Sequence, residues 1–251
     1  MWNTLPGSIV KLLLPSHLIS AVILLGIILL LSRYKRLGRR LIVIGGVTLL
    51  VVGVLPIGNW MIYPLERRYS DWSPKAPPTA IIIIPGSNHA DLDPSTQHGR
   101  LGERAAMIAI FARLYPQIPI YDFVSAGDNA DSPRQADGES LEQLVEDFAL
   151  PNKQVKISRG AEDLADIVKF CGDRLPHSSG ERWLLVAPAI QMPLLMTKFR
   201  QQDLPVEAHP IDRRITKRRD LYPSISVPGG IASLDIAVYE WVRILFDRLR
   251  G

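Results

Sequence analysis

Cysteine is almost missing from this chain of 251 residues, which contains Cys171 alone. One thiol cannot form an intrachain disulfide, so the fold does not depend on one. Cys171 lies in a partly apolar stretch with helical spacing and has no evident histidine partner. We therefore expect a buried structural thiol there.

Several motifs that carry chemistry are also missing. The sequence has neither GxGxxG nor GxxxxGK[ST], so a nucleotide site of these types is unsupported. No serine lies in a nucleophile-elbow motif, so nucleophilic catalysis is not indicated. His89, Asp91 and Asp93 lack the spacing of a metal motif, and we expect no metal site. The need for any cofactor is left open.

Charge is unevenly distributed. The formal net charge is +4, yet five cations fall within one short stretch: Arg33, Lys35, Arg36, Arg39 and Arg40. Without them the chain carries a charge of about −1. The basic pI therefore indicates membrane topology and not a nucleic-acid partner.

Two long apolar runs flank this basic stretch, at residues 12–31 and 41–58. Each is close to the roughly 20 residues that cross a bilayer, and we predict two transmembrane helices with the lipid bilayer as a partner. The first run ends on the cations and has no small-x-small site, which argues against a cleaved signal peptide. Cations stay cytoplasmic, so the rest of the chain is predicted on the periplasmic side of a bacterial inner membrane.

The predicted organisation is a membrane anchor at 1–60, a proline-containing linker at 61–78 and an α/β domain at 79–251. Gly45, Gly46 and Gly53 would let the two spans approach closely, or are ordinary membrane-helix glycines. Trp60 and Tyr63 are expected at the interface.

Apolar strands alternate with helices throughout the predicted domain. The expected strands are 79–84, 118–124, 155–157, 183–187 and 206–209. The expected helices are 102–115, 139–148, 161–174, 193–202 and 231–249, with Ser158 as a plausible N-cap of the third. This alternation predicts a three-layer α/β/α Rossmann-like domain with a mostly parallel sheet.

Ligands bind such sheets at the carboxyl ends of the strands. The loops expected there are 85–100, 125–139, 158–163 and 188–193. Gly86, Ser87 and Asn88 could present backbone N–H groups to an anion. Arg100 and Arg104 could hold a phosphate or carboxylate, although a solvated helix arginine is an equal alternative for Arg104.

Glu139 and Asp163 are the candidate catalytic acids, and both fall near expected helix N-termini. Acids there also stabilise the helix dipole, which is the alternative role for each. The basic run at 211–220 could contact lipid headgroups or a phosphorylated substrate, or be a solvated loop.

The order of these segments resembles the DUF218 domain family, the YdcF-like bacterial envelope proteins. The resemblance rests on AIIIIPGSNHAD, on GERAAMIAIFARLYPQIPIYDFVSAG, and on the closing helix SLDIAVYEWVRILFDRLRG. It extends to SRGAEDLA and to LVAPAIQMPLL, where Met-Pro is kept. Gln191 and Leu194 stand where the family has histidine and arginine.

The resemblance adds Ser125, Gly127, Ser158 and Gln191 to the expected ligand-binding residues. It implies envelope biogenesis, in peptidoglycan assembly or lipid-carrier handling. Three hypotheses follow: a factor that binds an anionic envelope metabolite without catalysis, an enzyme acting on a phosphorylated lipid-linked or sugar substrate, or a non-catalytic assembly subunit that binds other envelope-assembly proteins. Whether the chain is an enzyme is left open.

Overall fold

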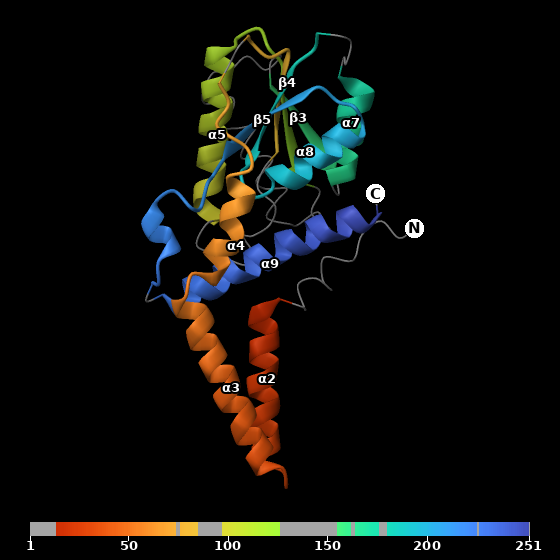
Figure 1. Cartoon of the computed structure of the whole chain (residues 1–251). Coiled ribbons are helices and arrows are strands. Elements are labelled where there is room, and N and C mark those ends of the chain that lie inside the picture. The colour runs from red at the N-terminus through yellow and green to blue at the C-terminus, as the bar shows by residue number, and fades with distance from the viewer. Residues whose placement is uncertain are drawn as a thin grey trace. The chain divides into compact units, whose positions relative to one another are not determined.

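The computed structural model describes residues 14–73, 76–84, 97–125, 155–161, 164–175, 180–224 and 226–250. The chain forms two compact units (Figure 1). Arg67–Arg213 makes an α/β unit, and Met1–Glu66 combines with Arg214–Gly251 into a helical unit.

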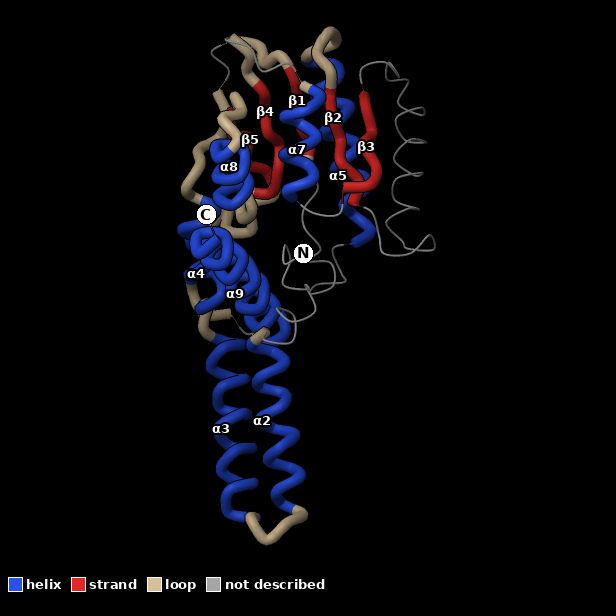
Figure 2. The backbone as a smooth tube through the Cα atoms, turned by 90° about the vertical axis from the view of Figure 1, so that its right-hand side faces the viewer, coloured by secondary structure: helices blue, strands red, loops and turns tan. Residues whose placement is uncertain are grey.

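Five parallel strands form the sheet of the α/β unit in the order β3-β2-β1-β4-β5 (Figure 2). The strands are β1 (Ala80–Ile83), β2 (Ile120–Ser125), β3 (Val155–Ala161), β4 (Trp183–Pro188) and β5 (Val206–Ile211). β1 and β4 are buried along their whole length, as a central parallel strand requires. The predicted Rossmann-like class is confirmed.

Helices cover both faces of this sheet. Helix α5 (Gln97–Leu114) packs on one face, where Ile108 and Phe111 meet alternate residues of β1 and β4. Helices α7 (Leu164–Arg174) and α8 (Met192–Gln201) cover the other face, where Phe199 is fully buried. Cys171 lies in that second core with no exposed surface, as the sequence predicted.

Strand β3 corrects one prediction. It runs to Ala161 and not to Ile157, and α7 begins only at Leu164. Ser158 is therefore paired with Phe123 inside the strand and is not a helix N-cap. The polar SRGA sequence resembles a loop, but parallel pairing with β2 supplies its backbone with hydrogen bonds.

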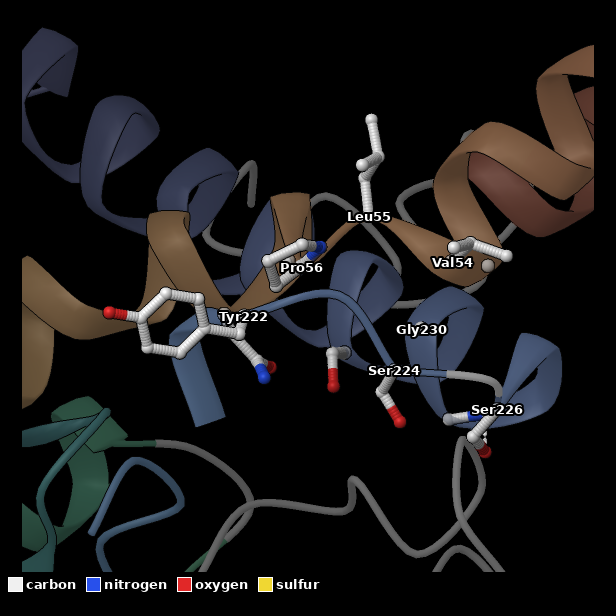
Figure 3. A pocket seen from close by; sticks show the side chains of 12 residues that line it. Val54, Leu55, Pro56, Tyr222, Ser224, Ser226 and Gly230 are labelled. Atoms are coloured by element: carbon white, nitrogen blue, oxygen red, sulfur yellow. Dashed lines mark hydrogen bonds between the residues drawn. The ribbon is translucent and has the colours of Figure 1, made fainter. Parts of the chain in front are cut away.

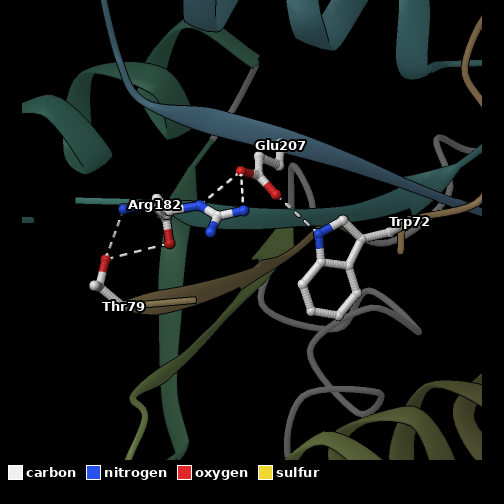
Figure 4. A network of polar contacts seen from close by, with 4 residues as sticks. All are labelled: Trp72, Thr79, Arg182 and Glu207. Carbon is white, nitrogen blue, oxygen red and sulfur yellow. Dashed lines mark hydrogen bonds and ion pairs between the residues drawn. The ribbon is translucent and has the colours of Figure 1, made fainter. Parts of the chain in front are cut away.

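The segment before β1 wraps around β5, an edge strand of the described sheet. Tyr69 packs against the α8-side core and Trp72 against the α5-side core, so this segment crosses the edge. Figure 4 shows Trp72 Nε1 donating to Glu207 Oε2 at 2.9 Å, while Arg182 Nε donates to Glu207 Oε1 at 2.8 Å. Covering an edge strand in this way blocks pairing with other chains.

The helical unit is built on an antiparallel pair, α2 (Pro15–Leu30) and α3 (Lys35–Val54). Three further elements complete it: α4 (Ile57–Glu66), the short helix η3 (Arg218–Leu221) and α9 (Val227–Arg250). Helix α3 starts six residues before the predicted span. The prediction followed only the apolar run, whereas the helix also includes the cations that precede it.

Helix α4 differs from the prediction. It takes up residues 61–66 at the start of the expected linker, with Pro64 inside its last turns. The chain bends just before it, where Leu55 is extended and precedes Pro56, a position that disfavours helical backbone.

Two glycines set the approach of α2 to α3. A Cβ on Gly38 would lie 2.7 Å from the carbonyl oxygen of Gly26 and 2.8 Å from the nitrogen of Leu30, both backbone atoms. Of the three glycines predicted at this interface, Gly45 faces Ile23 of α2. Gly46 has nothing within 4 Å, which fits the alternative of an ordinary membrane-helix glycine, and Gly53 approaches α9 instead of α2.

Candidate functional site

The strand order places a topological switch point between β1 and β4. The chain leaves β1 toward α5 on one face and leaves β4 toward α8 on the other. Loops that part in this way open a crevice at the carboxyl ends of the two strands, where doubly wound proteins bind ligands. By this general rule, the loops after β1 and β4 are the ones expected to bind a ligand among the four predicted.

The turn after β4 is tight and buried. The Ala189 N–H donates to the Ile211 carbonyl at 2.7 Å, which ties the turn to the end of β5. Gln191 is the N-cap of α8 and is 5% exposed, with its carbonyl accepting from Leu194 and Leu195 at 3.1 Å. The amide side chain of Gln191 cannot titrate, and Leu194 is also buried. This turn therefore brings no charge to the carboxyl end of β4.

Asp122 is a buried acid that sequence reasoning missed. It lies in β2 directly beside Ile83, the last residue of β1, and has no exposed surface. In the described part of the α/β unit, Asp122 and Gln191 are the buried side chains with polar or charged ends. A lone aspartate within the apolar strand IYDFV was the available signal, since aspartate is rarely fully buried.

The two predicted arginines fall on α5. Arg100 and Arg104 are one turn apart in its first two turns, the end of the helix that follows β1. The dipole of a helix favours negative charge near its N-terminus. The anion-binding role of the two arginines stays a prediction.

Only some of the remaining predicted site residues lie within the part of the chain that the structure describes. Ser125 ends β2 and Ser158 lies in β3, so both belong to adjacent strands on the carboxyl side of the sheet. Six residues lie outside the described residues: Gly86, Ser87, Asn88, Gly127, Glu139 and Asp163. Their roles stay predictions.

His209 of β5 is held between two aromatic rings, with Trp72 at 6.0 Å and Phe111 at 5.8 Å between ring centroids. Its Nδ1 is buried without a hydrogen-bond partner. Burial lowers the pKa of His209 below its usual 6.5, the Asp71 charge opposes that change, and Arg213 adds to it. The neutral ring suits an apolar packing role more than proton transfer.

No group of three or more metal-ligating side chains occurs among the residues that the structure describes. Burial raises the pKa of Cys171 to about 12, which keeps its thiol protonated and unreactive.

The basic run at 211–220 is largely engaged with its neighbours. Arg213 donates to Asp71 at 2.8 Å. The backbone of Arg214 and of Ile215 donates to the Glu66 carboxylate, at 2.8 and 3.0 Å. The run is therefore tied down at Arg213–Ile215, whereas Lys217, Arg218 and Arg219 are exposed.

A pocket of about 210 Å³ lies in the helical unit where α3, α4 and α9 meet (Figure 3). Glycines and serines make up much of its lining, and none of the lining residues is charged. Asn59 and Tyr222 supply its larger polar groups. Because no acidic or basic residue lines it, this pocket is a weaker candidate than the switch point.

Comparison with known proteins adds a full-length relationship. The chain is 23% identical over 260 residues to the envelope biogenesis factor ElyC of Escherichia coli strain K12, covering 100% of this chain and 97% of the relative. The chain is similar to ElyC along its entire length. ElyC of Escherichia coli O157:H7 matches to the same extent. No family model and no solved structure matches.

Proposed function

We propose that this chain is an envelope biogenesis factor, anchored in the inner membrane by α2 and α3, whose α/β unit lies in the periplasm and binds an anionic ligand at the switch point. The observation that carries the general role is the similarity to ElyC, which spans both units. A relationship limited to the α/β unit would have left the helical unit without a counterpart.

Membrane anchoring is supported by α3. By length and composition, it is the one described helix able to cross a membrane, and its 20 residues extend about 30 Å. Helix α2 is also apolar but has 16 residues. Large apolar side chains on both helices are about half exposed, including Leu24, Ile44 and Val47. A soluble protein rarely exposes so much contiguous apolar surface, whereas lipid would cover it.

The periplasmic orientation follows from the cations between the two helices. Lys35, Arg36, Arg39 and Arg40 lie in the first turns of α3, next to the α2–α3 turn. Positive residues near a short loop remain cytoplasmic. The α/β unit and the part of the helical unit that lies outside the bilayer would therefore be periplasmic.

Reporter fusions at Gly251 test this orientation. Alkaline phosphatase, which is active only in the periplasm, should give activity, and green fluorescent protein should stay dark. The opposite pair of results would reject the periplasmic location. Complementation of an Escherichia coli strain lacking ElyC tests the envelope role independently of topology.

An anionic ligand is supported by Arg100 and Arg104 at the start of α5. The test is thermal unfolding of the full chain in detergent with phosphorylated envelope metabolites. At 100 times its Kd, a ligand would stabilise the protein by about 2.7 kcal/mol. That gain should vanish in Arg104→Ala and persist in Arg113→Ala, which removes a cation from the last turn of the same helix.

An equal response of the two variants would place the ligand elsewhere, and no response to any metabolite would reject the anionic site.

Asp122 favours a second candidate function, hydrolysis or transfer on a phosphorylated substrate, because a buried acid beside a ligand site can serve as a general base. Turnover that Asp122→Asn abolishes while ligand-induced stabilisation persists would support it. Absence of turnover on the ligand that binds would exclude it.

A further inference from the structure

Helix α9 has an apolar stripe that its own unit leaves uncovered. Trp241, Leu245, Phe246 and Leu249 belong to its second half, and Leu245 and Leu249 are 55% and 74% exposed. The other side of the helix is covered, with Ile236, Ala237 and Glu240 fully buried. Helix α9 is therefore apolar on two sides, and one of them has no partner within the described helical unit.

The first half of α9 fixes the direction of this stripe. A Cβ on Gly53 would lie 2.7 Å from Val227 Cγ1, so the Val227 side of α9 contacts the end of α3. The Asp235 carboxylate accepts from the Ser16 N–H at 3.0 Å, so the Asp235 side contacts the start of α2. Both apolar helices lead away from α9 on the side bounded by these two residues.

The exposed stripe faces that same side. At about 100° per residue, Asp235 lies about 80° around the helix from Val227. Leu245 and Leu249 of the stripe lie about 0° and 40° from Val227, between the two contact directions. Trp241 and Phe246 lie about 40° and 20° beyond these directions, one on each side. Figure 1 shows α9 crossing the ends of α2 and α3, with its second half continuing past them.

We propose that the second half of α9 lies on the surface of the bilayer as an interfacial helix, with Leu245 and Leu249 buried among the lipid headgroups and upper acyl chains. The inference rests on the proposed membrane anchor. A bilayer that surrounds α2 and α3 must end near the level of α9, and an apolar stripe facing it would be covered by lipid. Arg248 is exposed next to the stripe and can reach phosphate groups, whereas Arg243 is paired with the buried Glu240.

Aromatic residues on the neighbouring helix agree with this depth. Trp60 and Tyr63 of α4 are 52% and 39% exposed, and such rings favour the headgroup level. Trp60 Nε1 donates to the Leu221 carbonyl and Trp241 Nε1 donates to the Met61 carbonyl, both at 3.0 Å. The polar atoms of both indoles are thereby satisfied while part of each ring stays available to lipid.

Site-directed fluorescence in the full chain tests the proposal. Cys171 is buried with a raised pKa and should not react with a maleimide dye at neutral pH, so it can remain in place. Four single substitutions to cysteine are labelled with an environment-sensitive dye and reconstituted in phosphatidylglycerol–phosphatidylethanolamine nanodiscs. They are Leu245→Cys and Leu249→Cys on the stripe, Asp247→Cys on the opposite side, and Val47→Cys in the middle of α3.

Doxyl groups attached to lipid near the headgroup should quench the dyes at 245 and 249, and both dyes should emit at shorter wavelength than the dye at 247. A dye at 47 should instead be quenched best by a doxyl group deep in the acyl chain. If 47 is quenched deeply while 245 and 249 match 247, α9 is not interfacial and only this inference fails. If lipid does not quench the dye at 47, the membrane anchor itself fails, and the interfacial helix with it.

Discussion

Glu66 is the residue at which two distant parts of the helical unit are joined. It ends α4, is 2% exposed, and accepts hydrogen bonds from the backbone of Arg214 and Ile215. A carboxylate can accept both donors with its two oxygens, and charge-assisted bonds of this kind are stronger than neutral ones. The return of the chain from the α/β unit is therefore fixed by one buried acid.

Glu66→Gln should lower the free energy of unfolding by about 1–3 kcal/mol, because the amide keeps one acceptor and turns an NH₂ group toward the second N–H. Thermal unfolding of the full chain in detergent measures this. Glu181→Gln, a partly exposed glutamate before β4, is the matched control and should leave the melting temperature nearly unchanged. Equal melting temperatures for the two variants would show that the Glu66 bonds contribute little.

His209 predicts a pH dependence of stability. Its pKa is lowered in the folded state by burial, so as the pH falls the unfolded chain takes up a proton first, near 6.5. The resulting contribution to stability is complete above pH 6.5 and is lost as the pH falls toward the lower folded pKa. His209→Leu removes both the titrating group and the unpartnered Nδ1, and should flatten the stability profile below pH 6.5.

Chemical denaturation of wild type and His209→Leu at pH 8, 7, 6 and 5 provides the measurement. The difference between the two should grow in favour of the variant as the pH falls. If the difference in unfolding free energy stayed constant across this range, the pKa of His209 would be the same in the folded and unfolded states.

At the scale of elements, the contact between α2 and α3 depends on Gly38. A Cβ there meets backbone atoms of α2, which cannot rotate away, so the helices must separate. Gly38→Ala should therefore destabilise the pair by about 1–3 kcal/mol, a typical cost of overpacking. Gly46→Ala in the same helix meets nothing within 4 Å, and should be neutral or stabilising by up to about 1 kcal/mol through helix propensity.

Thermal unfolding of both variants in the same detergent distinguishes packing from propensity. Should Gly38→Ala melt at or above the wild-type temperature, the close approach of the two helices would be refuted. The comparison is direct because each variant makes the same chemical change inside α3.

The elements were predictable to the extent that their signals are local. All five strands were predicted near their observed positions because continuous β-branched and aromatic runs such as AIIII and WLLVA suit buried parallel strands. Helix α4 was missed because Pro64 and the later prolines indicated a linker, although a proline near a helix end removes only one hydrogen bond. The extra length of β3 depends on its partner β2, which no local pattern specifies.

The candidate site was less predictable for the same reason. The strand order favours the loops after β1 and β4, but order is a property of tertiary pairing, and the sequence alone named four loops and could rank them only by length. Asp122 was passed over because its importance comes from burial beside β1 and not from any motif. Arg100 and Arg104 could be named from the sequence because their place near the start of a predicted helix is a local feature, and their role stays a prediction.

At the scale of the whole molecule, the boundary between the units does not follow the order of the chain. Both cores of the α/β unit are made from residues between 69 and 211, whereas α9 packs on α4, α3 and α2. A fragment that keeps α9 but lacks α2, α3 and α4 would expose Val227 and Leu234, which α3 and α4 cover. Such a fragment combines an intact α/β core with an uncovered apolar helix.

A fragment of residues 67–213 should therefore be soluble and unfold cooperatively, while residues 67–251 should aggregate or bind detergent and an apolar dye. Size-exclusion chromatography with and without detergent, followed by thermal unfolding, separates the two behaviours. If 67–251 were monomeric without detergent and bound no dye, α9 would have a second partner in the α/β unit, and its exposed stripe would be available for that contact and not only for lipid. If 67–213 failed to fold while 67–251 folded, α9 would be part of the α/β core, as the sequence first suggested.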